Sequence, residues 1–164
     1  FTPGLSNGAG LIEDSPVELH DTVVKSQLLE MVEEPVHTRF LFSDEVEVSA
    51  TNLNITCENL NIITRKIHNL YTSSKTSLEV ERIEAVDNVL IAQKGRTSTS
   101  GKAFILPKES KVVLEGLAVV QDADGRVAGH RITLLQGQRR AIVEGGGPAG
   151  ERARITLPAI PSQE

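Results

Sequence analysis

The sequence repeats a three-part phrase at a nearly constant spacing, and this repeat limits the folds open to the chain. The segments NVLI, SGKAFIL and KVVLEG align with LAVV, AGHRITL and RAIVEG. The alignment places Asn88 over Leu117, Gly101 over Gly129 and Gly116 over Gly145, with offsets of 29, 28 and 29 residues. A looser copy, EVEV with TCENLNI, lies 43 to 44 residues earlier. One such unit cannot bury its own apolar face, so the repeat predicts a stacked or rolled array of units.

Alternation of apolar and polar residues indicates that the units are β-strands. Between residues 40 and 50, one parity holds Phe40, Phe42, Val46, Val48 and Ala50, and the other holds Ser43, Glu45, Glu47 and Ser49. This is the pattern of a strand with one face toward solvent. The parity flips after Asn52 and again before Leu60, and each flip indicates a turn or a bulge. Similar short runs follow at 78–80, 83–91, 103–106, 112–114, 117–120, 131–135, 141–143 and 154–157. The chain is therefore predicted to be all-β and antiparallel, with many short strands.

Composition restricts the size and the partners of this fold. A chain of 164 residues suits one domain, and its apolar residues are mostly Val, Ile, Leu and Ala, with no Trp, one Tyr and four Phe. The net charge of -5 and the pI near 5.4, without clustered basic and aromatic residues, argue against a nucleic-acid partner. No run of 18 apolar residues is present, so no membrane-spanning helix is expected.

The residues that usually carry chemistry are scattered. The four histidines lie at least 17 residues apart, so none forms a close metal-binding pair. DADG at 122–125 suits a two-residue hairpin turn better than a calcium loop, and the glycine-rich 144–151 suits a loop better than a phosphate cradle. The single cysteine, Cys57, is interpreted as a packing residue, with a reactive thiol as the alternative. These patterns predict a protein that is not an enzyme and has no metal and no cofactor.

Three segments resemble the OstA/LptA family of periplasmic lipopolysaccharide-transport proteins, whose related domains occur in LptC and at the N-terminus of LptD. They are RFLFSDEVEVSATNLNITCENLNIIT, RIEAVDNVLIAQKGRTSTSGKAFILPKESKVVLEG, and LAVVQDADGRVAGHRITLLQGQRRAIVEG followed by GERARITLP. The resemblance covers about residues 38–158. Asp44, Asp87 and Leu117 stand where the family pattern has Gly, Asn or a small residue, which leaves the turn geometry at these positions open.

The resemblance implies an elongated, twisted antiparallel β-jelly roll whose apolar interior is open at its ends and along one seam. It also implies that acyl chains of lipopolysaccharide occupy this interior, while successive protomers and other Lpt-type components join through edge strands. Taken alone, DTVVKSQLLEMV at 21–32 favours a helix by its apolar spacing. Related chains carry a further strand before the first motif, so the resemblance changes this prediction to a strand.

Fifteen apolar residues are candidates for lining the lipid groove. They are Phe40, Phe42, Val46, Val48, Leu53, Ile55, Leu60, Ile62, Val89, Ile91, Ile105, Leu114, Val119, Ile132 and Leu134. The alternative is that several of them fill a closed core. Five basic residues are candidates for meeting lipid phosphates at the rim, with solvated surface charge as the alternative: Arg39, Arg65, Lys66, Lys102 and Arg131.

The expected organisation is a tail at 1–16, the jelly roll at 17–158 and a second tail at 159–164. Because the chain begins at Phe1, it suits either a processed export product or a trimmed chain. The predicted function is that of a periplasmic carrier or bridge for lipopolysaccharide transport to the outer membrane, with possible head-to-tail homo-oligomers. The alternative is a structural or adhesive β-repeat module that binds protein or glycan.

Overall fold

The computed structural model describes residues 21–68 and 76–161, and this part of the chain is all-β, as predicted. Its strands are β1 (Val23–Lys25), β2 (Leu28–Glu33), β3 (His37–Ala50), β4 (Leu53–His68), β5 (Thr76–Gln93), β6 (Arg96–Leu106), β7 (Lys111–Asp122), β8 (Gly125–Leu135), β9 (Arg140–Glu144) and β10 (Arg154–Thr156). Two short 3-10 segments, η1 (Pro107–Glu109) and η2 (Gln136–Gln138), follow β6 and β8. The predicted tail at 1–16 lies outside the described residues, as do residues 162–164 of the second tail, and the domain bounds stay predictions.

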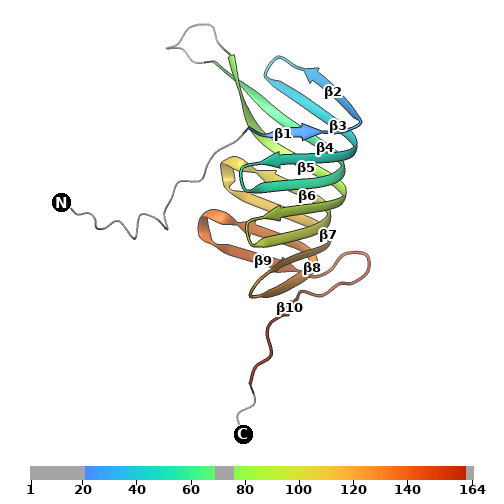
Figure 1. Ribbon diagram of the computed structural model, residues 1–164, viewed down its shortest axis with the longest axis vertical. Helices are drawn as coiled ribbons and strands as arrows, with labels where there is room; N and C mark the ends of the chain where they lie inside the picture. Colours follow the sequence, from blue (N-terminus) through green and yellow to red (C-terminus); the bar gives the residue numbers. More distant parts are fainter. Residues whose placement is uncertain (1–20, 69–75, 162–164) are drawn as a thin grey trace, which may run out of the picture.

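All the strands belong to one antiparallel sheet in which each strand from β3 to β8 pairs with the next along the chain. β1 and β2 both pair with β3 at one end, and β9 and β10 both pair with β8 at the other. Figure 1 shows the strands stacked along the long axis of the molecule, with β1 and β2 toward one end and β10 at the opposite end. The twisted antiparallel fold expected from the repeats is confirmed.

Three strands bend sharply at a pair of residues in the left-handed conformation. The φ values are 66° and 53° at Asp44 and Glu45, 68° and 52° at Asp87 and Asn88, and 82° and 48° at Gly116 and Leu117. The pairing register shifts beside each pair, as it does where an extra residue is inserted into a strand. These corners are the positions at which the chain departs from the family pattern, and five of the six residues take this conformation without being glycine.

The corners fold the sheet into two halves that face each other. The β2–β9 half comprises β2, β9 and residues 37–43, 60–68, 76–86, 102–106, 111–115 and 131–135. The β1–β10 half comprises β1, β10 and residues 46–50, 53–57, 89–93, 96–100, 118–122 and 125–129. Apolar residues of both halves pack into one continuous core, which gives the jelly roll its interior.

The short runs seen in the sequence join into longer strands that bend at the corners. A pair of left-handed residues keeps the apolar parity unchanged, so Phe42 and Val46 both face the core and the corner between them is invisible to alternation. The opposite strands flip parity instead, as β4 does between Cys57 and Leu60. Residues 21–32 form β1 and β2, which confirms the strand prediction for this segment.

Candidate functional site

The predicted groove-lining residues form most of the apolar stripe between the two halves. Ten of them are buried in the core: Phe42, Val46, Val48, Ile55, Leu60, Val89, Ile91, Leu114, Ile132 and Leu134. Four others are partly buried and pack against it: Phe40, Leu53, Ile62 and Ile105. The alternation in the sequence therefore located the inner face of β3 to β8 correctly, but this burial leaves open which of these residues contact a ligand.

Val119 is the exception, because the structure places it on the outer face of β7. Its neighbours Ala118 and Val120 are both in the core, so the side chain between them points away from it. Val119 instead lines an outer-surface hollow together with Leu117 and Ala128. In the sequence, 117–120 was treated as a run separate from 112–114, so the parity of Leu114 was not carried across Gly116 and Leu117; carried across, it selects Val120.

Six buried residues of the stripe are not among the candidate lining residues: Cys57, which was interpreted as a packing residue, and Ala85, Ala103, Val112, Ala118 and Val120. Alanine is only weakly apolar, so the three alanines do not identify the inner face of a strand from the sequence. Each is at most 1 % exposed, so its methyl group is enclosed by the neighbouring core side chains. The parity of Leu60, Val89 and Leu114 indicates these positions once the corners are known.

The centre of the stripe is closed. Ile55, Leu114, Ile132, Val46 and Val89 are each less than 2 % exposed, so small aliphatic side chains from the two halves fill the space between them. The interior, which the resemblance implies to be open at its ends and along one seam, is therefore filled by side chains at its centre. The ion pairs among the described residues, such as His37 with Glu81 and Arg131 with Glu115, each lie within one half, so the halves meet through apolar contacts.

Cys57 lies in this closed centre, where it is 4 % exposed and unpaired with any other cysteine. Burial raises the pKa of its thiol to about 11, and the sulfur donates a hydrogen bond to the backbone carbonyl of Asn59 at 3.3 Å. A thiol with so high a pKa is a poor nucleophile at neutral pH. The packing interpretation of Cys57 is therefore the one that the structure supports.

Four of the five predicted rim cations are held in ion pairs. Arg39 pairs with Glu34 at 3.1 Å, Arg65 with Glu81 at 3.6 Å, Lys66 with Glu33 at 3.7 Å and Arg131 with Glu115 at 2.6 Å. All are at least partly exposed, so each pair contributes little to stability and leaves little free positive charge for a ligand. Only Lys102 of the five has no ion pair in the described part of the chain.

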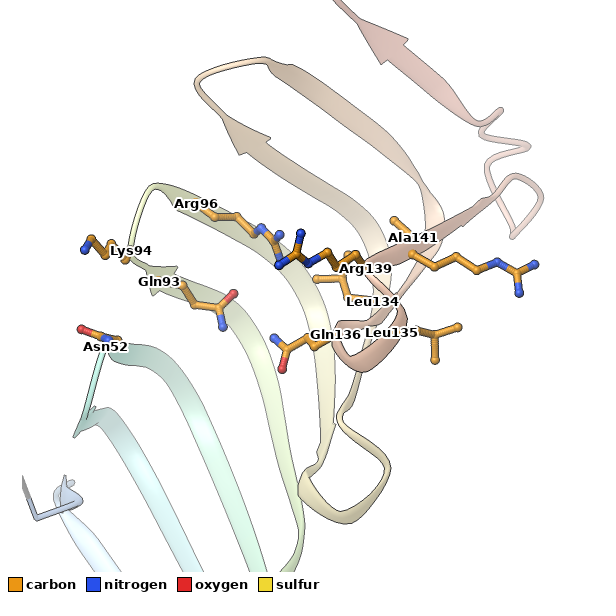
Figure 2. A pocket seen from close by; sticks show the side chains of 10 residues that line it. Asn52, Gln93, Lys94, Arg96, Leu134, Leu135, Gln136, Arg139 and Ala141 are labelled. Carbon is orange, nitrogen blue, oxygen red and sulfur yellow. The ribbon is translucent and has the colours of Figure 1, made fainter. Parts of the chain in front are cut away.

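A pocket of about 560 Å³ opens between the two halves on the side away from the corners, and we call it the seam pocket. Figure 2 shows its walls, which are the β3–β4 and β5–β6 turns on one side and η2 with the adjoining ends of β8 and β9 on the other. The lining residues are Asn52, Gln93, Lys94, Arg96, Leu134, Leu135, Gln136, Arg139, Arg140 and Ala141. Four are cationic and none is acidic. Arg139 and Arg140 are adjacent in the sequence, which was the available signal for a site that our sequence analysis missed.

Within the described residues, no helix is long and apolar enough to cross a membrane. In the same residues, no three His, Cys, Asp or Glu side chains are arranged to hold a metal ion. The candidate site is thus the apolar stripe with the seam pocket at its margin. It places aliphatic side chains next to four cations that have no ion pair among the described residues, and such an arrangement has the polarity of an amphiphile.

The fold is that of the LptA-like β-jelly rolls. The chain is similar in structure to LptH, the LptA-homologous periplasmic component of the conserved lipopolysaccharide transport device from Pseudomonas aeruginosa. The TM-score is 0.66 and the sequence identity 12 %, and the match covers 85 % of this chain and 96 % of LptH. No protein-family model matches the sequence, and no curated protein matches it. The likeness therefore shows a shared fold.

Proposed function

We propose that this chain is a periplasmic carrier of lipopolysaccharide or a similar acylated lipid, acting as one unit of a protein bridge toward the outer membrane. The observation that carries the proposal is the apolar stripe, which is continuous between the facing halves in a fold shared with a lipopolysaccharide-transport component. In this role the stripe holds acyl chains, and the protein supplies no chemistry of its own.

The size of the hydrophobic effect explains why such a lipid requires a carrier. At about 0.8 kcal/mol per methylene, exposing one acyl chain of ~12 carbons to water costs roughly 10 kcal/mol. A lipid with several acyl chains cannot cross an aqueous space by free diffusion. Contacts with Val, Ile and Leu side chains replace those of the bilayer without specific recognition, which suits the composition of this interior.

The closed centre requires the two halves to separate when an acyl chain enters. Contacts between the halves are apolar and non-directional, so methylene groups of a lipid can replace side-chain contacts with a similar gain in buried area. The ion pairs and strand pairing within each half are unaffected by this movement. Opening along the side of the seam pocket leaves the corners as hinges.

The terminal strands supply the means of joining units into a bridge. In the described part of the chain, β1 and β2 pair only with β3, and β9 and β10 pair only with β8. Their outer edges therefore retain backbone donors and acceptors that can pair with a strand of another chain. Exposed apolar residues accompany both ends, among them Leu28, Met31 and Ile155.

Native mass spectrometry with a short-core lipopolysaccharide tests the proposal. The wild-type chain should form a one-to-one complex. Leu134→Asp, which places a charge at the margin of the stripe, should weaken the complex at least tenfold because a carboxylate replaces an apolar contact with the acyl chain. Val119→Asp places the same charge on the outer face of the neighbouring strand and should leave binding unchanged.

Thermal unfolding of both variants ensures that a loss of binding is not a loss of fold. Absence of any complex with the folded wild-type chain would contradict the carrier role. The adhesive alternative gives the reverse pattern, because a module that binds through its outer faces should be sensitive to Val119→Asp and tolerant of Leu134→Asp.

A further inference from the structure

We infer that the seam pocket binds the phosphate group of an amphiphile whose acyl chains lie between the two halves. This inference rests on the proposed function and assigns the headgroup end of the ligand to named residues. The cations concerned are Lys94, Arg96, Arg139 and Arg140. They differ from the rim cations predicted from the sequence, most of which are already neutralised by carboxylates.

The charge of the pocket contrasts with that of the chain. The whole chain carries a net charge of -5, yet the four charged residues that line the pocket are all positive. None of the four makes an ion pair in the described part of the chain. Because Arg96 and Arg139 are unpaired and extend toward each other, a dianionic group bound between them relieves their repulsion and gains charge-assisted hydrogen bonds.

The two central arginines come from opposite walls of the pocket. In Figure 2, Arg96 from the start of β6 and Arg139 from the end of η2 extend toward each other across the opening. Two guanidinium groups that converge in this way can each offer a planar pair of donors to phosphate oxygens. The amides of Gln93 and Gln136 lie on the same two walls and add neutral donors.

The backbone at Arg139 is a second, independent feature of this wall. Arg139 ends η2 in the left-handed conformation with φ 51°, which an arginine adopts at a cost and glycine adopts freely. Ser110 ends η1 in the same conformation with φ 49°, 29 residues earlier in the repeat. Both 3-10 segments thus end in a left-handed residue, so this backbone conformation recurs with the repeat. Only the second segment has an arginine there, and that arginine lines the seam pocket.

The cations on the opposite wall likewise have no counterpart in the neighbouring repeat unit. The β5–β6 turn, with Lys94 and Arg96, corresponds at an offset of 29 residues to the β7–β8 turn, which has Ala123 and Gly125 at these positions. A two-residue turn at the same place in the repeat thus forms without either cation. Of these two turns, the one that carries the cations is the one that lines the seam pocket.

The floor of the pocket connects this charge to the apolar stripe. Leu134 lines the pocket and is also a buried member of the core. A phosphate held by the arginines therefore lies next to the point at which an attached acyl chain would pass between the halves. A free phosphate ion would use the cations alone and gain nothing from this contact.

Titration calorimetry below the micelle-forming concentration tests the inference with three probes. Dodecyl phosphate has both an anionic phosphate head and an alkyl tail. Dodecyl maltoside has the same tail with a neutral head, and inorganic pyrophosphate has the charge without a tail. Because hydrogen bonds between charged groups are strong, dodecyl phosphate should bind at least about tenfold more tightly than either other probe. Its affinity should also fall with added salt.

Arg139→Gly is the informative variant, because it removes a cation while relieving the left-handed backbone. Combined with Arg96→Gln, it should bring the affinity for dodecyl phosphate down to that for dodecyl maltoside, with a melting temperature no lower than that of wild type. As a control, Ser110→Gly with Lys111→Gln relieves the left-handed residue after η1 and removes one cation outside the seam pocket, and it should leave binding unchanged.

The outcomes separate this inference from the proposed function. Equal binding of the two dodecyl amphiphiles would overturn the inference while leaving lipid carriage intact. Equal binding of pyrophosphate and dodecyl phosphate would overturn it in favour of a free-anion site. Failure of both amphiphiles to bind would contradict the carrier role itself.

Discussion

The centre and the ends of this molecule follow different rules although they are built from the same repeat. In the centre, Ile55, Leu114 and Ile132 are completely buried, because each unit has a neighbour on both sides and a facing half above it. At the ends, Leu28 is 60 % exposed and Ile155 is 60 % exposed, because among the described strands β2 and β10 each have a neighbour on one side only. In a repeat fold, burial is thus supplied by the adjacent unit, and the terminal strands retain surface for another chain.

The largest effect on stability is expected when a side chain in the centre and one in a terminal strand are each replaced by alanine. Ile132→Ala should lower the free energy of unfolding by about 2–5 kcal/mol, because it leaves a cavity in the closed centre. Met31→Ala in β2 removes a side chain that is 62 % exposed and should change it by less than about 0.5 kcal/mol. Urea unfolding followed by circular dichroism measures both, and similar costs at the two sites would refute the contrast.

Cys57 tests whether the centre is closed in solution. With its pKa raised to about 11 from 9.0, the native thiol should react with iodoacetamide at pH 8 about 100-fold more slowly than in urea. The unfolded thiol loses its proton at a lower pH than the native one, so the free energy of unfolding should fall as pH rises from 9.0 to about 11. Cys57→Ala should lack this component of the pH dependence. Native labelling as fast as that in urea would mean that the centre opens readily without a ligand.

The terminal strands are tested by association. If β2 pairs with another copy, Leu28→Glu with Met31→Glu should weaken self-association at least about tenfold, because both charges would be placed in an apolar contact. Analytical ultracentrifugation over a range of concentrations measures this change. The same substitutions should leave the melting temperature almost unchanged, since both residues are exposed. A wild-type chain that stays monomeric at every concentration would exclude self-pairing of this edge.

The smallest expected effect concerns a corner that brings the two halves together. Leu117 has φ 48° and is 69 % exposed, so its side chain gains little from packing to offset the left-handed backbone. Leu117→Asn should raise the free energy of unfolding by about 1 kcal/mol, because Asn tolerates this conformation better than Leu. Leu90→Asn, an exposed strand residue with ordinary backbone, is the control and should not stabilise the protein. A loss of stability at Leu117 would show that this corner depends on the leucine side chain.

Much of the fold could be predicted from the sequence because alternation reports directly which face of a strand is buried. Phe42, Ile55 and Leu134 were assigned to the inner face in this way, and the structure buries all three. The corners could not be predicted, because a pair of left-handed residues such as Asp44 and Glu45 preserves parity and leaves no break in the pattern. Val119 was misassigned because the run 117–120 was treated as a separate strand, although the parity of Leu114 continues through this corner.

The seam pocket escaped prediction for a different reason. Arg96 and Arg139 are far apart in the sequence and belong to different repeat units, so only the folded sheet brings them to one opening. Their lack of carboxylate partners is also a property of the fold, since ion pairs such as that between Lys108 and Glu79 are equally invisible in the sequence. Linear patterns identified the interior, whereas the headgroup site required the three-dimensional arrangement.

The central claim is that acyl chains occupy the space between the two halves, and site-specific photo-crosslinking to lipopolysaccharide tests it most directly. A diazirine side chain placed at Leu134 or Val48, on the inner face, should crosslink to the lipid in the folded protein. The same group at Val119, on the outer face, should not. Equal crosslinking from inner and outer positions, or none from Leu134 and Val48, would contradict the claim.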